Sequence, residues 1–366
     1  MQFVPSLWQG GAELVAVNLA FALKDRVGKL VFASSGGEPY TQRLRDGGIE
    51  LVIVPRPKPR LIPIIRSARA LARVLRRERP HVIHAHNPGA SAAAWLARRL
   101  ARTPGTAIVT TYHGVVPARV GHANRALAWF SDLVVGVGPT ATETLVARGL
   151  PAESTRTIFN AVDPEIHRSR DELRAEFGVP DGVPLVVNVG RYVEQKNQAL
   201  LLEALAKLER PFKALVVGYG ELEQTLRDRT ASLGLADRVI VTGERDDAAD
   251  LIAAGDVFVM SSDWEALPLV VLEALVLGTP VVATRAGAVA DVVQTGNSGL
   301  LVERGDADAL ASAIAQVLDD PQLAQRLTEG GLEFARDSCS VTRMADAYAV
   351  AYADALARRA GAKPST

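Results

Sequence analysis

The stretch DVFVMSSDWEALPLVVLEALVLGTPVVAT, from Asp256 to Thr284, contains one complete strand–helix–strand unit. Its two ends, DVFVMSS and TPVVAT, are short apolar runs rich in β-branched residues. Between them, Pro268 suits the first position of a helix and Gly278 suits the exit. Apolar runs without alternation are typical of parallel strands that helices cover on both faces, so the stretch predicts a βαβ unit.

The same plan recurs from one end of the chain to the other. Similar runs are KLVFAS, IELVIVP, HVIHAH, AIVTTYH and DLVVGVG in the first half, and PLVVNVG, KALVVGYG and RVIVTG in the second. Because 366 residues suit two domains better than one, we expect an α/β protein with two Rossmann-like, doubly wound domains. Proline and glycine cluster between His167 and Pro184, which predicts domains at residues 1–167 and 168–340 and a C-terminal segment at 341–366.

Composition excludes several kinds of protein. The chain is 48% hydrophobic and 22% charged, as in ordinary globular proteins. Cys339 is the only cysteine, which excludes an intrachain disulfide and a cysteine-based zinc site. The first residues lack a signal-peptide pattern, and no apolar run approaches the ~18 residues of a membrane span. We expect a cytoplasmic protein with no metal, no other cofactor and no nucleic-acid partner.

The zero net charge conceals two oppositely charged halves. Residues 1–170 hold 23 Lys and Arg against 11 Asp and Glu, whereas the remainder holds 18 against 30. Much of the positive excess lies in Arg56 to Pro80, where nine basic residues accompany a single acid, Glu78. Apolar residues recur in this segment at helical spacing. It is either an ordinary helix with a solvated basic face or a surface for anionic lipid headgroups or an anionic acceptor.

In open α/β sheets, ligands bind beyond the carboxyl ends of the strands. In the second half, the strand that ends at Gly190 is followed by Arg191 and Lys196. These cations can neutralise the oxygens of a leaving diphosphate, or they are plain surface cations. Gly218 and Gly220 follow the next strand, but the third glycine of the dinucleotide fingerprint is missing, so an NAD site is poorly supported.

The first half offers weaker signals at its strand ends. Gly10 and Gly11 come just before a helix, where free N–H groups suit an anion, although such turns also occur without a ligand. His84 and His86 share one strand face, where a histidine is more often packed and hydrogen-bonded than catalytic. His113 stands beside a glycine at a strand end, and we expect it to face the ligand.

Glu265 and Glu273 lie eight residues apart in otherwise apolar sequence. We expect Glu265 in the loop before the helix and Glu273 within the helix. An ionised carboxylate can accept hydrogen bonds from both hydroxyls of a vicinal diol, and the free N–H groups around residues 266–269 suit hydroxyl or phosphate oxygens. In the alternative, Glu273 pairs with a structural arginine and Glu265 is exposed to solvent.

Taken in order, the motifs resemble those of the retaining glycosyltransferases of family four, which have the GT-B architecture. The motifs are GGAE at Gly10 to Glu13, VGRYVEQKN at Val189 to Asn197, VVGYGELE at Val216 to Glu223, the two glutamates, LGTPVVAT at Leu277 to Thr284 and GNSGLLV at Gly296 to Val302. The resemblance covers essentially the whole chain. It implies two domains facing each other across a cleft, with the helix RMADAYAVAYADALARRA crossing back to the first domain.

The resemblance also implies roles for individual residues. Arg191 and Lys196 would hold the diphosphate, Glu273 the ribose hydroxyls and Glu265 the donor sugar near its 3-hydroxyl. His113 would touch the sugar, so the catalytic candidates are His113, Arg191, Lys196 and Glu265. The expected substrate-binding residues are Gly10, Gly11, Glu13, His86, Asn160, Gly190, Ala266, Leu267, Pro268, Leu269 and Glu273.

The chain departs from the family pattern in three places. After VVAT, the usual Gly-Gly-x-x-Glu is replaced by a segment that runs from Ala286 to Asp291. The usual Asn-Gly-Val-Asp begins at Asn160, with alanine in second place. Both departures concern the donor sugar rather than the class of reaction. The first strand begins nearly at Met1 and is short, which leaves open a native start upstream.

These observations predict a retaining hexosyltransferase that takes a UDP- or GDP-linked sugar in its acidic domain and a hydroxyl acceptor on its basic one. The segment from Arg56 to Pro80 suggests a lipid-linked or otherwise anionic acceptor at the inner face of the cytoplasmic membrane. The product would belong to cell-envelope polysaccharide, lipopolysaccharide or glycolipid. Two rivals are a nucleotide-sugar 2-epimerase, which needs no acceptor, and a non-catalytic sugar-nucleotide-binding protein, which needs neither both cations nor both glutamates.

Overall fold

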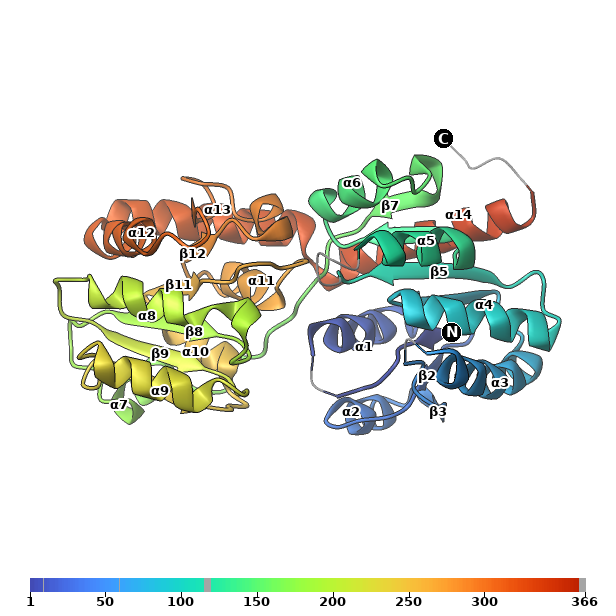
Figure 1. The fold of residues 1–366 in the computed structure, drawn as a ribbon, viewed down its shortest axis with the longest axis horizontal. Helices are drawn as coiled ribbons and strands as arrows, with labels where there is room; N and C mark the ends of the chain where they lie inside the picture. The colour runs from blue at the N-terminus through green and yellow to red at the C-terminus, as the bar shows by residue number, and fades with distance from the viewer. Residues whose placement is uncertain (9, 59, 115–119, 362–366) are drawn as a thin grey trace. The chain divides into compact units, whose positions relative to one another are not determined.

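The structure, a computed structural model, describes residues 1–8, 10–58, 60–114 and 120–361. It divides into two compact units (Figure 1). Unit 1 consists of Met1–Ala161 together with Val341–Thr366, and unit 2 consists of Val162–Ser340. The division after Ala161 lies a few residues before the boundary expected after His167. The chain therefore contributes to unit 1 twice, once at its beginning and once at its end.

Unit 1 is built on one parallel sheet of seven strands. In chain order the strands are β1 (Gln2–Phe3), β2 (Val31–Ser34), β3 (Glu50–Ile53), β4 (Val82–His86), β5 (Ala107–Tyr112), β6 (Leu133–Gly136) and β7 (Thr155–Thr157). In space they follow the order β3-β2-β1-β4-β5-β6-β7. Strands β2 and β4 both pair with β1, so the winding direction reverses between β1 and β4.

The helices of unit 1 connect these strands. They are α1 (Gly11–Leu23), α2 (Tyr40–Asp46), α3 (Leu61–Glu78), α4 (Pro88–Ala101), α5 (Val120–Phe130), α6 (Pro139–Ala147), the short η2 (Ala152–Ser154) and α14 (Val341–Arg359). The basic segment is α3, whose buried stripe includes Ala68, Leu71 and Leu75 and packs against α4. Leu61 and Ile62, in its first turn, are instead 73% and 71% exposed.

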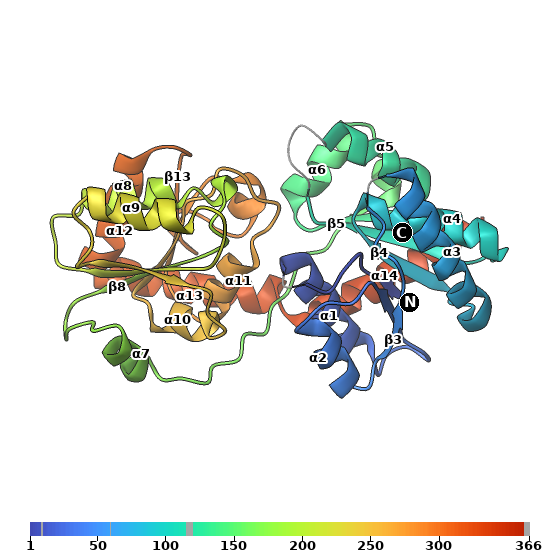
Figure 2. The same ribbon diagram turned by 60° about the horizontal axis from the view of Figure 1, so that its bottom comes forward.

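Helix α14 returns to unit 1, as the resemblance implies (Figures 1 and 2). It packs against α1 and β5 and buries a stripe that includes Tyr348, Ala351 and Ala355. An ion pair of 2.9 Å joins Asp354 of α14 to Arg156 of β7. Helix α14 therefore packs into the core of unit 1, together with elements from the first part of the sequence.

Unit 2 holds a second parallel sheet, of six strands, in the order β10-β9-β8-β11-β12-β13. The strands are β8 (Leu185–Val189), β9 (Lys213–Val217), β10 (Val239–Gly243), β11 (Val257–Met260), β12 (Val281–Thr284) and β13 (Leu300–Val302). The helices are α7 (Arg170–Glu176), η3 (Glu194–Lys196), α8 (Gln198–Ala206), α9 (Glu223–Ser232), α10 (Ala248–Ala254), α11 (Leu269–Val276), η4 (Gly287–Asp291), α12 (Ala307–Asp319) and α13 (Pro321–Ser338). These two sheets confirm the predicted two-domain α/β class.

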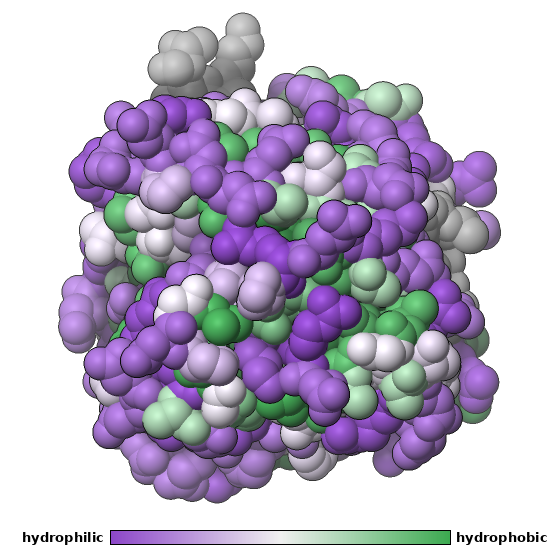
Figure 3. All heavy atoms as spheres, turned by 90° about the vertical axis from the view of Figure 1, so that its left-hand side faces the viewer, coloured by the Kyte–Doolittle hydropathy of each residue, from purple (hydrophilic) through white to green (hydrophobic). Residues whose placement is uncertain are grey.

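The two sheets determine where ligands are expected. In each sheet, the winding direction reverses beside the central strand, between β1 and β4 in unit 1 and between β8 and β11 in unit 2. Helices that leave in opposite directions open a crevice there, beyond the carboxyl ends of the strands. The loops after these four strands carry most of the residues that the sequence singles out. The side of unit 2 shown in Figure 3 is mainly hydrophilic, and its hydrophobic residues form small, separate patches.

Candidate functional site

Two loops of unit 2 are joined at the crevice between β8 and β11. The backbone N–H of Asp263 donates to the carbonyl of Gln195 at 2.9 Å, and Gln195 Nε2 donates to the carbonyl of Trp264 at 2.9 Å. Asn197 Nδ2 donates to Asp263 Oδ1 at 3.0 Å, while the other side-chain atom of Asn197 caps α8. Neither Gln195 nor Asp263 stands out in the sequence, because polar loop residues give no signal until their partners are known.

An ion pair lies where these two loops meet. Lys196 Nζ is 2.6 Å from Glu265 Oε1, and the side chains are only 16% and 7% exposed. Gln195 Nε2 makes a further, long contact of 3.4 Å with the other carboxylate oxygen. An ammonium group carries three donors, so the pair leaves Lys196 with hydrogen-bonding capacity for a second anion. Two residues that the sequence assigns to one site are therefore brought together.

Arg191 lies on an exposed turn, and its guanidinium has no partner among the described residues. Its backbone carbonyl is held, because it accepts from the N–H of Val193 and from Gln198 Nε2, each at 3.0 Å. An exposed cation beside Gly190, close in sequence to Lys196, increases the positive charge at this strand end. The turn can accept an anionic ligand without first breaking an ion pair of Arg191.

The loop after β9 packs against the backbone of residues 190–192, the turn that carries Arg191. Tyr192 N–H donates to the carbonyl of Tyr219 at 2.7 Å. A Cβ added to Gly218 would lie 2.0 Å from the oxygen of Gly190, and one added to Gly220 would lie 2.3 Å from the oxygen of Tyr192. Both glycines also have positive φ, of 151° and 154°. The Gly-x-Gly pair that resembles a dinucleotide fingerprint therefore serves close backbone packing.

Glu273 lies on α11 with no partner among the described residues. Its carboxyl makes neither an ion pair nor a hydrogen bond within that part of the chain, so it is not tied to a structural arginine. Burial raises the pKa of Glu273 to about 7. A half-buried carboxyl without donors is costly to ionise, and donors from a ligand would relieve that cost.

The start of α11 supplies free backbone donors. The helix begins at Leu269 with Pro268 as its N-cap, one residue later than predicted. Because proline has no N–H, only Ala266, Leu267 and Leu269 of the four expected residues can donate. In the described part of the chain, the N–H groups of Leu267 and Leu269 find no acceptor. They are typical orphan donors of a helix start and can bind an oxygen ligand.

The loop after β12 packs against the backbone of Glu265. A Cβ added to Gly287 would lie 1.9 Å from the carbonyl oxygen of Glu265, and Gly287 has a φ of +57°. The next residue, Ala288, donates its N–H to the carbonyl of Ala266 at 3.2 Å. Despite the departure from the family pattern here, the segment packs directly on the loop that carries Glu265.

In unit 1, the first candidate group lies at the start of α1. Gly10 is the extended N-cap, Gly11 is the first helical residue and is exposed, and Glu13 lies in the first turn. A Cβ added to Gly10 would lie 2.5 Å from Glu13 Oε2, so any larger residue at Gly10 would displace that carboxylate. Asn160, the remaining candidate, is 4% exposed, and its buried Oδ1 has no partner among the described residues.

The histidines form the second group in unit 1. His86 is fully buried, with Nδ1 2.9 Å from His113 Nε2 and Nε2 3.0 Å from Gln2 Oε1. Both ring nitrogens of His86 are therefore engaged inside the protein, behind the half-buried His113. Burial lowers the pKa of His113 to about 4 and the pKa values of His84 and His86 well below the usual range. All three rings are neutral at physiological pH.

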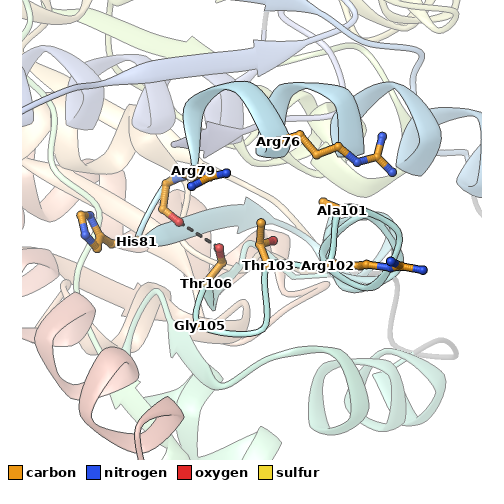
Figure 4. Close-up of a pocket in the computed structure, with 9 residues that line it drawn as sticks. Arg76, Arg79, His81, Ala101, Arg102, Thr103, Gly105 and Thr106 are labelled. Atoms are coloured by element: carbon orange, nitrogen blue, oxygen red, sulfur yellow. Dashed lines mark hydrogen bonds between the residues drawn. The ribbon is translucent and has the colours of Figure 1, made fainter.

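Two hollows of unit 1 open at the opposite, amino-terminal edge of the sheet. One, of about 710 Å³, is lined by Arg76 and Arg79 at the end of α3 and by Arg102 after α4 (Figure 4). The three guanidinium groups do not converge on a common point in this view, and Arg76 donates to the carbonyl of Leu100. The other, of about 630 Å³, is mainly apolar and lies beside Met1. Neither lies at a crevice beyond the strand ends.

Two further searches cover the described ranges, without residues 9, 59, 115–119 and 362–366. They contain no group of three or more His, Cys, Asp or Glu side chains able to hold a metal ion. They also contain no helix that is both long and apolar enough to cross a membrane.

Comparison with protein-family models gives two matches that together cover most of the chain. Residues 169–334 match the model described as Glycosyl transferases group 1, and residues 9–166 match the model described as Glycosyltransferase Family 4. The boundary between the two matches falls close to the boundary between the two units.

Curated proteins and solved structures agree with these matches. The chain is 31% identical over 348 residues to the lipopolysaccharide core biosynthesis glycosyltransferase LpsE of Rhizobium meliloti, covering 93% of this chain and 94% of LpsE. It is 28% identical over 300 residues to N-acetyl-alpha-D-glucosaminyl L-malate synthase of Bacillus anthracis, covering 79% and 78%. Anabaena Alr3699/HepE, solved with UDP and glucose, superposes with a TM-score of 0.83 at 23% identity, covering 95% and 98%. The last likeness establishes the GT-B fold.

Proposed function

Because this chain belongs to the glycosyl transferases group 1 family and is a glycosyltransferase, we propose that it moves a hexosyl unit from a nucleotide-diphosphate sugar to a hydroxyl acceptor with retention. The observation that carries the proposal is the joined pair of loops in unit 2. They hold Lys196 against Glu265 and leave the side chains of Arg191 and Glu273 without a partner among the described residues. LpsE acts in lipopolysaccharide core biosynthesis, and HepE binds UDP with glucose, which supports a nucleotide-sugar donor and a product in cell-envelope polysaccharide, lipopolysaccharide or glycolipid.

The cations are assigned to the diphosphate. Arg191 is exposed and unpaired among the described residues, and Lys196 has donors to spare beside Glu265. As the bond to the sugar breaks, negative charge grows on the leaving diphosphate, and fixed cations stabilise that charge more in the transition state than in the bound donor. The orphan N–H groups at the start of α11 add neutral donors to the same edge of the sheet.

The two carboxylates are assigned to different diols. No described residue donates a hydrogen bond to the carboxyl of Glu273, and the hydroxyls of a ribose would supply such donors. Glu265 is oriented by Lys196, so its carboxylate can accept a hydrogen bond from a sugar hydroxyl near the 3-position of the sugar. Since Glu265 is committed to this ion pair, we assign it no role as a nucleophile.

Retention then follows from attack on the face from which the leaving group departs. The bond between the anomeric carbon and the diphosphate oxygen breaks, and its electron pair stays on the diphosphate. The acceptor oxygen forms the new bond to the same face of that carbon, and its proton passes to a departing phosphate oxygen. This step needs no covalent sugar–protein intermediate.

The donor assignment is tested by calorimetry with UDP-glucose, UDP-N-acetylglucosamine and GDP-mannose, followed by transfer assays with the tightest ligand. We expect submillimolar binding of one of them, and NMR of the product should show the anomeric configuration of the donor. Glu273→Gln should weaken nucleotide binding, whereas Glu265→Gln should chiefly lower turnover. Absence of binding by all three donors, or wild-type kinetics in both folded variants, would refute the proposal.

We also propose that the acceptor is lipid-linked or otherwise anionic and that unit 1 meets it at an anionic membrane surface through residues 56–80. Within the described part of this segment, the side chains of seven cations are exposed and make no ion pair or hydrogen bond with other described residues: Arg56, Lys58, Arg60, Arg66, Arg69, Arg73 and Arg79. Leu61 and Ile62 add exposed apolar surface among them. Cations flanking apolar side chains are typical of interfacial binding.

Vesicle flotation tests the membrane proposal. Wild-type protein should float with vesicles rich in phosphatidylglycerol at low salt and dissociate as salt is raised, because screening weakens surface electrostatics. The triple variant Arg66→Gln, Arg69→Gln, Arg73→Gln and the double variant Leu61→Ser, Ile62→Ser should each lose binding. A matched control, Arg227→Gln with Arg229→Gln on α9, removes paired cations of unit 2 and should float normally. Flotation that is equal with neutral vesicles would contradict an anionic partner.

A further inference from the structure

A series of hydrogen-bonded side chains links Tyr352 of α14 to His113 within unit 1. Gln2 Nε2 on β1 donates to Tyr352 Oη on α14 at 3.1 Å, and Gln2 Oε1 lies 3.0 Å from His86 Nε2. His86 Nδ1 lies 2.9 Å from His113 Nε2. Gln2 and His86 are fully buried, so solvent does not compete for these hydrogen bonds. These hydrogen bonds connect β1, α14, β4 and the residue that follows β5.

The direction of each hydrogen bond follows from its neighbours. The amide oxygen of Gln2 can only accept, so His86 carries its proton on Nε2. A neutral His86 then has a bare Nδ1, which can only accept, so His113 carries its proton on Nε2. A neutral His113 then has a bare Nδ1, and that atom makes no hydrogen bond within the described residues.

The imidazole rings of His86 and His113 are both neutral near pH 7. Desolvation holds the pKa of His113 at about 4 and the pKa of His86 well below its usual range. Tyr352 Oη lies 2.8 Å from His84 Nδ1 as well as 3.1 Å from Gln2 Nε2. With its single proton donated to His84 Nδ1, the Tyr352 hydroxyl can only accept from Gln2, which keeps Gln2 Oε1 facing His86. Turning that amide would exchange donor and acceptor at each later link and leave His113 with its proton on Nδ1.

We propose that Gln2 and Tyr352 are positioning residues that fix His113 as the tautomer protonated at Nε2, so that its Nδ1 presents a lone pair to a substrate hydroxyl. The tautomer depends only on the protein, while its use toward substrate rests on the proposed function. The backbone of His113 is held independently, because its N–H donates to Asn87 Oδ1 at 3.2 Å. Losing the tautomer would therefore change the chemistry of the ring more than its position.

Tyr348 provides a matched control. It lies on the same helix as Tyr352, its hydroxyl is 2.7 Å from Thr111 Oγ1, and it is fully buried. Among the described residues, its hydroxyl is linked by hydrogen bonds to Tyr352 only through Thr111 and His84, at the far end of the network from His113. Tyr348→Phe and Tyr352→Phe each remove one buried hydroxyl from α14, but only the second removes a partner of Gln2.

Nitrogen-15 NMR of ¹⁵N-histidine-labelled protein near pH 7.5, without substrate, reads the tautomer directly. Wild-type His113, assigned through the signal lost in His113→Asn, should show one tautomer, protonated at Nε2. Gln2→Leu and Tyr352→Phe should each show a mixture of both tautomers, and Tyr348→Phe should match the wild type. A wild-type proton on Nδ1, or an unchanged tautomer in Tyr352→Phe, overturns the proposal, even if Gln2→Leu fails to fold.

Kinetics test the consequence for substrate. Tyr352→Phe should lower kcat by about 3- to 10-fold with little change in donor KM, as expected for one neutral hydrogen bond lost in the transition state, and Tyr348→Phe should leave both constants near wild type. Equal losses in the two variants would indicate a merely structural role. If none of the three nucleotide sugars binds, the proposed function fails, while the NMR result still decides the tautomer.

Discussion

At the scale of single residues, the structure separates side chains that already have partners from those that await them. Lys196 and Glu265 satisfy each other, whereas Arg191 and Glu273 make no ion pair in the described part of the chain. A ligand that donates hydrogen bonds to Glu273 gains the most, because that carboxyl is already desolvated by burial, whereas the exposed Arg191 offers a charge that water still solvates.

Glu273 should make both stability and binding depend on pH. Burial raises its pKa to about 7 from an ordinary 4.5, so the folded protein retains a proton that the unfolded chain releases. This stabilisation is fully present below about pH 4.5 and is lost as pH rises through 7. Against wild type in urea unfolding, Glu273→Gln should be equally stable near pH 5 and more stable by about 2 kcal/mol at pH 8.

The same carboxyl predicts tighter nucleotide binding at higher pH. Ribose hydroxyls donate best to an ionised carboxylate, so affinity should rise as pH passes 7, and calorimetry of Glu273→Gln should show no such rise. A variant that keeps the wild-type pH dependence of affinity would assign the effect to another group.

Arg191 and Lys196 should differ in what their loss costs the fold. Arg191→Ala removes an exposed cation that has no partner among the described residues, so it should change the free energy of unfolding by less than about 0.5 kcal/mol. Lys196→Ala leaves Glu265 largely buried without its cation and should cost about 1–3 kcal/mol. Both should lower turnover by roughly 10²- to 10³-fold through the lost charge at the diphosphate.

Denaturant unfolding and single-turnover rates measure the two effects separately. Arg227→Ala, which removes an exposed cation on α9, serves as the control and should leave turnover unchanged. Loss of stability in Arg191→Ala as large as that in Lys196→Ala would contradict the partners described for these residues.

The sequence alone predicted that the cations Arg191 and Lys196 and the carboxylates of Glu265 and Glu273 would belong to the site. It did not predict which side chains these groups would contact in the folded protein. Pairs of cations and carboxylates near strand ends are visible in a sequence because their types and spacings are local. Gln2 and Tyr352 are separated by 350 residues, and their hydrogen bond exists only once the chain has folded back. Pro268 is a different case, because its lack of an N–H is a property of the sequence itself.

At the scale of elements, the loops that carry the site are positioned by glycines on neighbouring loops. Gly220→Ala would place a methyl group 2.3 Å from the carbonyl oxygen of Tyr192 and force a φ of 154° on alanine. We expect it to cost about 3 kcal/mol or more in free energy of unfolding and to weaken nucleotide binding by moving Arg191.

Gly234 gives the matched control for Gly220. Its φ is +67°, but a Cβ added there meets nothing within 4 Å. Gly234→Ala should therefore cost only the ~1–2 kcal/mol of a left-handed alanine and leave nucleotide affinity unchanged. Equal costs for the two substitutions in denaturant unfolding would mean that backbone conformation, and not close packing, explains Gly220.

The elements themselves were the most predictable part of the molecule. Apolar runs such as DVFVMSS and TPVVAT became buried parallel strands because burial on both faces leaves few other uses for such sequence. The amphipathic spacing of residues 61–78 became α3, but Leu61 lies exposed in its first turn. Periodicity identifies a helix and its main face, but not which residues of that face are covered in the folded protein.

At the scale of the whole molecule, the division into units predicts how fragments behave. Unit 2 is one continuous segment with its own core, so residues 162–340 should unfold cooperatively when expressed alone. Residues 1–161 lack α14 and should be largely unfolded, because the surface that buries Tyr348 and Ala355 would be open. Circular dichroism and denaturant unfolding measure both outcomes.

Adding α14 back controls for this experiment. A peptide of residues 341–361 supplied to fragment 1–161 should restore structure in proportion to its concentration, since binding only the folded form shifts the equilibrium by mass action. A peptide with Tyr348 and Tyr352 both replaced by serine should restore much less. Fragment 1–161 with the stability of the full chain would show that α14 is not required.

Helix α14 also gives biosynthesis a fixed order. Domains fold as units while the ribosome is still working, and Val341–Arg359 leaves the ribosome only after all of unit 2 has been made. Unit 2 is therefore expected to fold first. Unit 1 can complete its fold only after α14 has been synthesised, although most of its residues are made before unit 2. A nascent chain that terminates before Tyr352 would carry the loops of unit 2 but not the hydroxyl beside Gln2. Enzymatic competence would thus require translation through α14.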